Sequence, residues 1–356
     1  MASIPITYLT SSTYGAPVCP WYDDESLFEF PRLPPAGRLV AATRAPSAVT
    51  TLFPIESAEP VAPKDAQGDH APRYLRLDAR ADGEIPALPA ATLIRGRASE
   101  ALDLLPAESV RTVVTSPPYW SLRDYDSGDP FGRDDTLRDY IASIAADFHK
   151  LRRVLKGDGT VWLNIGDAYT SGNRRYRAPD RKNRARAMSV RPRTPHGLKP
   201  KDLIGLPWRV AFALQDEGWW VRSEVIWHKP NAHPESVTDR PTKAHETVFL
   251  LSKHQDYYYD VNAVRGANDR RLRTVWDIAT SPRRRGRIPD DDHPAPMPIG
   301  LARRCVSLTS EPDDAVLDPY AGSGTTLLAA AQLRRRWIGI ELKEEFVRLI
   351  ERRMGR

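Results

Sequence analysis

Two short segments bring together residue types that could hold a ligand and act on it. Residues 318–326 read Asp-Pro-Tyr-Ala-Gly-Ser-Gly-Thr-Thr and lie between a predicted strand and a predicted helix. Glycines in such a turn let the backbone approach a ligand, and the helix N-terminus directs N–H groups at it. The turn lacks the P-loop pattern Gly-x-x-x-x-Gly-Lys-Ser/Thr. Because Glu341 ends the next predicted strand, where an acid can accept both hydroxyls of a ribose, these features predict a nucleoside-bearing cofactor.

The second segment, residues 115–120, reads Thr-Ser-Pro-Pro-Tyr-Trp and follows a predicted buried strand. Proline fixes φ and has no N–H, so the carbonyl oxygens before and within the Pro-Pro pair are acceptors held in one geometry. Ser116 adds a hydroxyl and Tyr119 an aromatic face. These groups would form a socket for an exocyclic amino group on a stacked base. Taken alone, the segment is equally compatible with a simple loop or a phosphorylation site.

Together, in this order and at this separation, the two motifs resemble those of β-class amino-group DNA methyltransferases, over roughly residues 91–353. The resemblance implies S-adenosylmethionine as the cofactor and double-stranded DNA as the substrate. It implies catalytic roles for Ser116, Pro117, Pro118 and Tyr119. The cofactor-binding residues that it implies are Asp318, Pro319, Tyr320, Ala321, Gly322, Ser323, Gly324, Thr325 and Glu341.

Other segments also bear on the resemblance. Residues 227–231 (Trp-His-Lys-Pro-Asn) would flank the target-base pocket, and residues 296–301 (Pro-Met-Pro-Ile-Gly-Leu) would pack near the methionine end of the cofactor. One segment departs from the family pattern. Members often carry a Gly-Asp pair whose acid lies near the cofactor adenine, whereas residues 94–97 here read Ile-Arg-Gly-Arg, so no adenine contact is assigned to Arg97.

Alternating strands and helices must position these motifs. Hydrophobic patterning predicts strands at 91–95, 110–114, 160–165, 219–228, 246–252, 314–317 and 336–341, and helices at 136–155, 202–217, 324–333 and 343–353. This alternation predicts an α/β fold around a mostly parallel sheet. The resemblance specifies a seven-stranded Rossmann-like methyltransferase sheet with helices on both faces and a circularly permuted motif order.

The domain organisation follows from composition as well. Residues 1–90 contain 13 of the 32 prolines, which disfavours long helices and central strands, so we expect an N-terminal arm or accessory region there. Residues 91–356 would form the methyltransferase catalytic domain.

Basic charge is concentrated in two segments of an otherwise acidic chain. Residues 170–200 carry a net charge of +9 and residues 265–287 carry +6, whereas the whole chain carries +6. Concentrated arginine favours a polyanion such as nucleic acid over the alternative of two solvated loops. We expect a basic loop at 170–200 and a target-recognition region at 262–290. The candidate DNA-binding residues are Arg174, Arg175, Arg177, Arg181, Lys182, Arg184, Arg270, Arg271, Arg273, Arg283, Arg284 and Arg285.

Composition excludes several other classes. The sequence contains neither a membrane-spanning apolar stretch nor a secretory signal pattern at its start. The only cysteines, Cys19 and Cys305, make neither a disulfide framework nor a cysteine-rich zinc site. We therefore expect a cytoplasmic protein with no metal and no membrane partner.

The target base can also be narrowed. Methylation of cytosine C5 needs a cysteine nucleophile, and neither cysteine lies in a fitting context. In the family, Ser-Pro-Pro-Tyr is associated with N4 of cytosine, whereas Asp-Pro-Pro-Tyr or Asn-Pro-Pro-Tyr is associated with N6 of adenine. We expect a cytosine-N4 methyltransferase, with adenine N6 as the alternative. An inactive DNA-binding relative and an RNA or protein substrate rank lower, and a separate cognate restriction endonuclease is a further candidate partner.

Overall fold

The computed structural model describes residues 74–80, 89–120, 136–170, 194–232, 234–266, 269–280 and 297–355. The chain divides into two units, Met1–Glu59 and Pro60–Arg356, and every described residue lies in the second. The strands are β1 (Leu75–Asp78), β2 (Ala91–Arg95), β3 (Val110–Thr115), β4 (Leu155–Ile165), β5 (Trp220–His228), β6 (His245–Ser252), β7 (Val275–Asp277), β8 (Ala315–Asp318) and β9 (Arg336–Glu341). The helices are α1 (Ala98–Leu104), α2 (Leu137–Val154), α3 (Leu206–Asp216), α4 (Ile299–Thr309), α5 (Thr325–Gln332) and α6 (Glu344–Met354).

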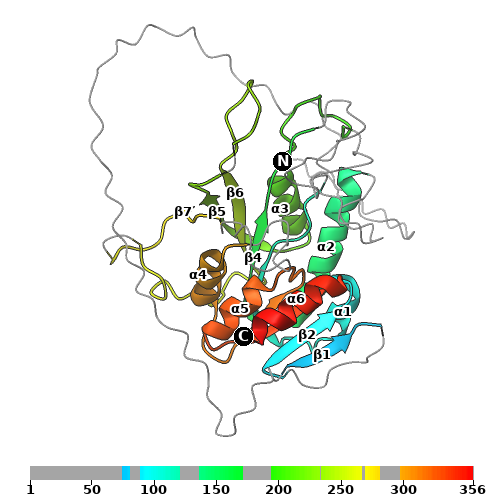
Figure 1. The fold of residues 1–356 in the computed structure, drawn as a ribbon, viewed down its shortest axis with the longest axis vertical. Helices are drawn as coiled ribbons and strands as arrows, with labels where there is room; N and C mark the ends of the chain where they lie inside the picture. Colours follow the sequence, from blue (N-terminus) through cyan, green and yellow to red (C-terminus); the bar gives the residue numbers. More distant parts are fainter. Residues whose placement is uncertain are drawn as a thin grey trace, which may run out of the picture. The chain divides into compact units, whose positions relative to one another are not determined.

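All these strands join one sheet in the order β1-β2-β9-β8-β3-β4-β6-β5-β7. Only β6 runs antiparallel to its neighbours β4 and β5, so the sheet is mostly parallel, as expected. In Figure 1, β1 and β2 lie at one end of the sheet, and β5, β6 and β7 lie at the other. The sheet has nine strands where the resemblance implies seven, and the two that sequence patterning missed, β1 and β7, are its edges.

Helices cover both faces of the sheet, which confirms the expected fold class. Buried residues of α1, α2 and α3 pack in one apolar cluster, and those of α4, α5 and α6 pack in a second. Along β3, Val113 belongs to the first cluster and Val114 to the second. Consecutive strand residues face opposite sides, so a strand between two helical layers must be apolar at nearly every position.

The helix α2 shows how local sequence builds one of these layers. Thr136 caps its N-terminus by accepting a hydrogen bond from the Asp139 N–H at 3.1 Å. Buried Tyr140, Ile144 and Phe148 then recur every four residues along one face.

The junction after α2 differs from the expectation. The sequence predicts a helix that ends at residue 155 and a strand that begins at residue 160, but β4 already begins at Leu155 and includes residues 156–159. Leu155 pairs with Val110, and the register then shifts before Thr112 pairs with Thr160. This irregularity in the ladder accommodates the additional residues within the strand.

None of the helices in the described part of the chain is long and apolar enough to cross a membrane.

Core burial leads to a stability prediction. Phe148 is fully buried in α2, whereas Phe212 on α3 is 55% exposed. We expect Phe148→Ala to lower the free energy of unfolding by about 3–5 kcal/mol, because the substitution removes buried contacts and leaves a cavity. Phe212→Ala, the matched control, should cost less than about 1 kcal/mol. Urea denaturation of both variants checks this, and equal losses would contradict the packing described for α2.

Candidate active site

The two chemistry-bearing motifs end neighbouring strands. Residues 115–120 follow β3, residues 318–326 begin at the end of β8, and these strands pair in parallel through Thr112 with Val316 and Val113 with Leu317. From this pair the chain continues in opposite directions across the sheet, from β3 to β4 and from β8 to β9. In open α/β sheets, ligands bind at the carboxyl edge where the strand order reverses in this way. The fold therefore brings both motifs to one expected binding edge.

A direct hydrogen bond joins the motifs. The Thr115 hydroxyl donates to Asp318 Oδ1 at 2.7 Å, although the two residues are 203 positions apart. The same oxygen accepts from the Tyr320 N–H at 3.1 Å. Burial raises the pKa of Asp318 to about 6, and the hydrogen bonds from Thr115, Thr326 and Tyr320 oppose that rise. Asp318 thus fixes the start of the glycine turn against the end of β3.

The glycine turn needs its glycines for backbone reasons. Gly322 and Gly324 have φ values of 53° and 74°, in the left-handed region that favours glycine. A Cβ on Gly324 would lie 2.9 Å from Ile350 Cγ1 on α6. Because the turn is this tight, α5 begins immediately at Thr325.

Glu341, at the end of β9, completes this half of the site. Its carboxylate accepts hydrogen bonds from the N–H groups of Gly322 and Lys343, both at 2.8 Å. Burial raises the pKa of Glu341 to about 7, against the lowering effect of these two donors. Since each carboxylate oxygen has two lone pairs, Glu341 can still accept hydrogen bonds from two further hydroxyls.

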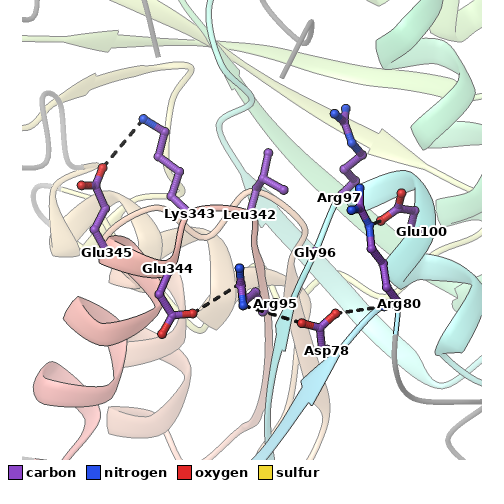
Figure 2. A pocket seen from close by; sticks show the side chains of 10 residues that line it. All are labelled: Asp78, Arg80, Arg95, Gly96, Arg97, Glu100, Leu342, Lys343, Glu344 and Glu345. Atoms are coloured by element: carbon purple, nitrogen blue, oxygen red, sulfur yellow. Dashed lines mark hydrogen bonds and ion pairs between the residues drawn. The ribbon is translucent and has the colours of Figure 1, made fainter. Parts of the chain in front are cut away.

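A pocket of about 720 Å³ opens next to Glu341. Figure 2 shows its lining from the ends of β1, β2 and β9, with Arg95 paired to Asp78 and Glu344. The lining residues are Asp78, Arg80, Arg95, Gly96, Arg97, Glu100, Leu342, Lys343, Glu344 and Glu345. This volume lies in the range of ligand pockets. The turn after β2, where the family's adenine contact is expected, forms part of the wall, because the Gly96 N–H donates to the Glu341 carbonyl oxygen at 3.1 Å.

These residues fit a nucleoside cofactor. A buried acid with spare lone pairs, a tight glycine turn at a helix N-terminus and a pocket of sufficient size lie at one edge of the sheet. The departure at residues 94–97 places Arg95 and Arg97 in the pocket wall where the family pattern has an acid.

The second half of the site is a polar network around Tyr119. The Ser116 hydroxyl donates to the Tyr119 hydroxyl at 3.1 Å, and the Tyr119 hydroxyl donates to Glu246 Oε2 at 2.7 Å. The Asn164 amide donates to the Tyr119 hydroxyl at 3.0 Å and to Glu246 Oε2 at 2.9 Å. Because β6 runs antiparallel to β4, its first residues lie beside the last residues of β4. The network therefore joins the ends of three strands.

A lysine balances the charge of this network. Lys229 Nζ lies 2.5 Å from Glu246 Oε1 and 4.4 Å from the centre of the Trp227 ring. Burial alone would raise the pKa of Glu246, but Lys229 together with the hydrogen bonds from Tyr119 and Asn164 lowers it below its ordinary value. Glu246 is therefore an anionic acceptor.

The helix α2 supports both motifs from behind. Tyr140 donates a hydrogen bond to the Pro118 carbonyl oxygen at 2.8 Å. About two helical turns further along α2, Asp147 accepts a hydrogen bond from the Tyr320 hydroxyl at 2.5 Å. One rigid element thus contacts the loop after β3 and the turn after β8.

Of residues 227–231, Lys229 reaches the network with its side chain, through Glu246. Trp227 Nε1 donates to the Ile278 carbonyl oxygen at 2.7 Å, His228 Nδ1 lies 2.6 Å from Asp277 Oδ1, and Asn231 pairs with Thr280 through hydrogen bonds of 2.9 Å. This segment therefore also ties β7 and the residues after it to β5.

The structure describes only part of the expected DNA-binding set. Arg270, Arg271 and Arg273 are exposed to solvent. Residues 171–193 and 281–296 lie outside the described residues, so neither Arg174–Arg184 nor Arg283–Arg285 is placed. Of residues 296–301, Met297 packs against the second apolar cluster and Leu301 is buried in α4.

Sequence reasoning missed two residues of the network, Asn164 and Glu246. Asn164 is a polar side chain next to the last residue of β4, after the apolar run 161–163, and Glu246 is the second residue of β6. A polar residue at a strand end on the binding edge is the signal that could have identified them.

Comparisons with known proteins agree with this geometry. Residues 110–352 match the N6/N4 DNA methylase family model. The type II methyltransferase M.Cfr9I of Citrobacter freundii is 51% identical over 268 residues, covering 74% of this chain and 87% of that protein. M.SmaI of Serratia marcescens is 51% identical over 270 residues, covering 74% of this chain and 90% of that protein.

Two solved structures share the fold. A PvuII cytosine-N4-specific DNA methyltransferase has a TM-score of 0.58 at 22% identity, covering 80% of this chain and 92% of that one. TTHA0409 of Thermus thermophilus, a putative DNA modification methylase complexed with S-adenosyl-L-methionine, has a TM-score of 0.52 at 25% identity, covering 79% of this chain and 95% of that one.

The environment of Glu341 leads to a pH prediction. Its pKa is about 7 in the folded chain against an ordinary 4.5, so the folded protein retains a proton that the unfolded chain releases between these values. The ionised, buried Glu341 therefore destabilises the fold increasingly as pH rises through this window, and its destabilising effect is complete above the folded pKa. We expect Glu341→Gln to make the free energy of unfolding fall less steeply between about pH 4.5 and about pH 7.

Urea denaturation without added cofactor checks this prediction. Glu108→Gln, at a side chain that is 66% exposed, serves as the control for the loss of one carboxylate. Parallel pH profiles for the parent and Glu341→Gln would contradict the burial described for Glu341.

Proposed function

The chain belongs to the N6/N4 DNA methylase family, and from that premise we propose that it methylates the exocyclic N4 of cytosine in double-stranded DNA. The family membership confirms the resemblance inferred from sequence and makes the chain a DNA methyltransferase. The choice of N4 over adenine N6 rests on Ser116 in the loop after β3, because the Ser-Pro-Pro-Tyr form of the motif is associated in the family with N4 of cytosine. Because Ser116 directs its proton toward Tyr119 at 3.1 Å, its oxygen lone pairs can accept a hydrogen bond from an amino group.

The cofactor is S-adenosylmethionine, the ligand of the related TTHA0409 structure. Glu341 and the turn from Asp318 to Thr325 would hold it, with the ribose hydroxyls on the spare lone pairs of Glu341. When bound, the cofactor supplies an electrophilic methyl group on a sulfonium. The pocket beside Glu341 provides room for the adenine.

The residues after β3 would hold the target base. A base inside a duplex is out of reach, so the target must leave the helix stack. Tyr119 then offers a stacking face, and Ser116 and the Pro117 carbonyl accept hydrogen bonds from the amino group. These bonds keep the nitrogen lone pair out of the ring and directed at the methyl donor, so transfer relies on proximity and electrostatics.

A covalent route through Cys305 does not fit the structure. Cys305 is 1% exposed in α4 and packs in the second apolar cluster. Burial raises the pKa of its thiol, which disfavours the thiolate that a nucleophile requires. This placement supports transfer to an amino group over transfer to carbon. Cys19 lies outside the described residues.

The names of the relatives extend the proposal. M.Cfr9I and M.SmaI are type II methyltransferases at 51% identity. We therefore include a separate restriction endonuclease with the same recognition sequence as a partner of this chain.

The product identifies the target base. DNA from cells that express the chain should contain N4-methylcytosine, measured by mass spectrometry of digested nucleosides, and DNA from cells without it should not. N6-methyladenine would replace the proposal with the adenine alternative, and the absence of any methylated nucleoside would favour an inactive DNA-binding relative. Mapping the modified positions gives the recognition sequence, at which a partner endonuclease should cut unmethylated DNA.

Substitutions in the two motifs should have separable effects. Tyr119→Ala removes a stacking face worth about 1–3 kcal/mol per base, so methyl transfer should fall severely while cofactor affinity stays unchanged. Glu341→Ala should weaken cofactor binding by about 1–3 kcal/mol, the scale of a lost hydrogen bond to a charged group. Calorimetric titration and single-turnover methyl incorporation measure the two effects. Parental transfer by Tyr119→Ala would show that this pocket is not the active site.

A further inference from the structure

Glu246 accepts hydrogen bonds on both carboxylate oxygens from donors in three different segments. Oε2 accepts from Tyr119 at 2.7 Å and from Asn164 at 2.9 Å, and Oε1 lies 2.5 Å from Lys229 Nζ. The donors come from the loop after β3, the end of β4 and the residue after β5, and Glu246 itself lies near the start of β6. One side chain thus fixes the relative positions of four segments at the binding edge.

The Tyr119 ring is also confined from another side. A Cβ added to Gly166 would lie 2.8 Å from Tyr119 Cε2 and 3.2 Å from Cδ2, so the Gly166 backbone packs directly against the ring. The ring is therefore held by backbone at one edge and by the Glu246 carboxylate at its hydroxyl.

We propose that Glu246 is a positioning residue of the methyl-transfer site, acting through the Tyr119 hydroxyl to hold the ring in its stacking geometry. This inference rests on the proposed function and deepens it, because it assigns a role to a residue outside both motifs. Charge is essential to the role. A carboxylate accepts stronger hydrogen bonds than a neutral group, and Lys229 keeps Glu246 ionised despite its burial.

Glutamine cannot replace glutamate here, although the two side chains have nearly the same shape. The three neighbours Tyr119, Asn164 and Lys229 all direct donors at residue 246. A glutamine has one acceptor oxygen and one NH2 group, so either orientation turns an NH2 toward Lys229 or toward Tyr119 and Asn164. Glu246→Gln therefore disturbs the hydrogen bonds while preserving the volume.

A double-mutant cycle tests the coupling. Glu246→Gln and Tyr119→Phe should each lower the single-turnover rate of methyl transfer by about tenfold to a hundredfold, since small displacements of a positioned group have effects of this size. Because the proposal has Glu246 act through the Tyr119 hydroxyl, which Tyr119→Phe removes, the double variant should be no more than about twofold slower than the slower single variant. Cofactor affinity should stay within about twofold of the parent in all three variants.

Asp314→Asn is the matched control for a lost buried ion pair. Asp314 lies just before β8, at the amino end of this strand, whereas the site lies at its carboxyl end. The Asp314 carboxylate is 10% exposed and pairs with Lys156 and Arg111. Asp314→Asn should lower the melting temperature without changing the transfer rate. If its rate falls as far as that of Glu246→Gln, loss of stability explains both and the proposal is wrong.

A second readout does not depend on activity. In protein labelled with 3-fluorotyrosine, the fluorine resonance that Tyr119→Phe removes belongs to Tyr119. It should shift or broaden in Glu246→Gln and stay in place in Asp314→Asn. An unchanged resonance, parental transfer by Glu246→Gln, or multiplying effects in the double variant would each overturn the positioning role. If the parent methylates no DNA while the resonance still shifts, the proposed function has failed and the anchoring of Tyr119 stands.

Discussion

The hydrogen bond from Thr115 to Asp318 is the contact on which the site depends. It links the last residue of β3 to the last residue of β8 across 203 positions of sequence. Because both side chains are buried and the strands pair in parallel, the loop after β3 and the turn after β8 leave the sheet from one shared point. The proposed base pocket, built on the first, and the proposed cofactor turn, built on the second, are thereby held in a fixed relation.

Three carboxylates along this edge, of which Asp318 and Glu341 are buried and Glu246 is partly buried, are held by different donors. Asp318 and Glu341 accept from hydroxyl or backbone N–H groups, and burial raises the pKa of both. Glu246 pairs with the Lys229 ammonium, and its pKa is lowered. Because the donors to Asp318 and Glu341 are neutral, further hydrogen bonds from hydroxyl groups would still stabilise the ionised form of these two acids, which suits cofactor binding. The Lys229 ammonium keeps Glu246 ionised, so that Glu246 accepts strong hydrogen bonds from Tyr119 and Asn164.

Most residues of the segment 227–231, which covers the end of β5 and the residues after it, support the sheet edge. Trp227, His228 and Asn231 attach β7 and the residues that follow it to β5, whereas Lys229 reaches Glu246. One short segment thus combines an edge contact with a contact in the Tyr119 network. The side chains of a strand alternate between faces, so neighbouring residues can serve such different surroundings.

The sequence by itself determined the alternation of strands and helices, the two motifs and the acid at the end of β9, because each is written in contiguous residues with a recognisable period or turn. The tertiary structure decided the rest. The four residues of β1 and three of β7 are too short for periodicity, and they are strands because β2 and β5 offer them edges. Asn164 and Glu246, 82 positions apart, meet Tyr119 only because β6 runs antiparallel to β4. Strand order and direction are non-local, and no local pattern encodes which polar strand ends will share one carboxylate.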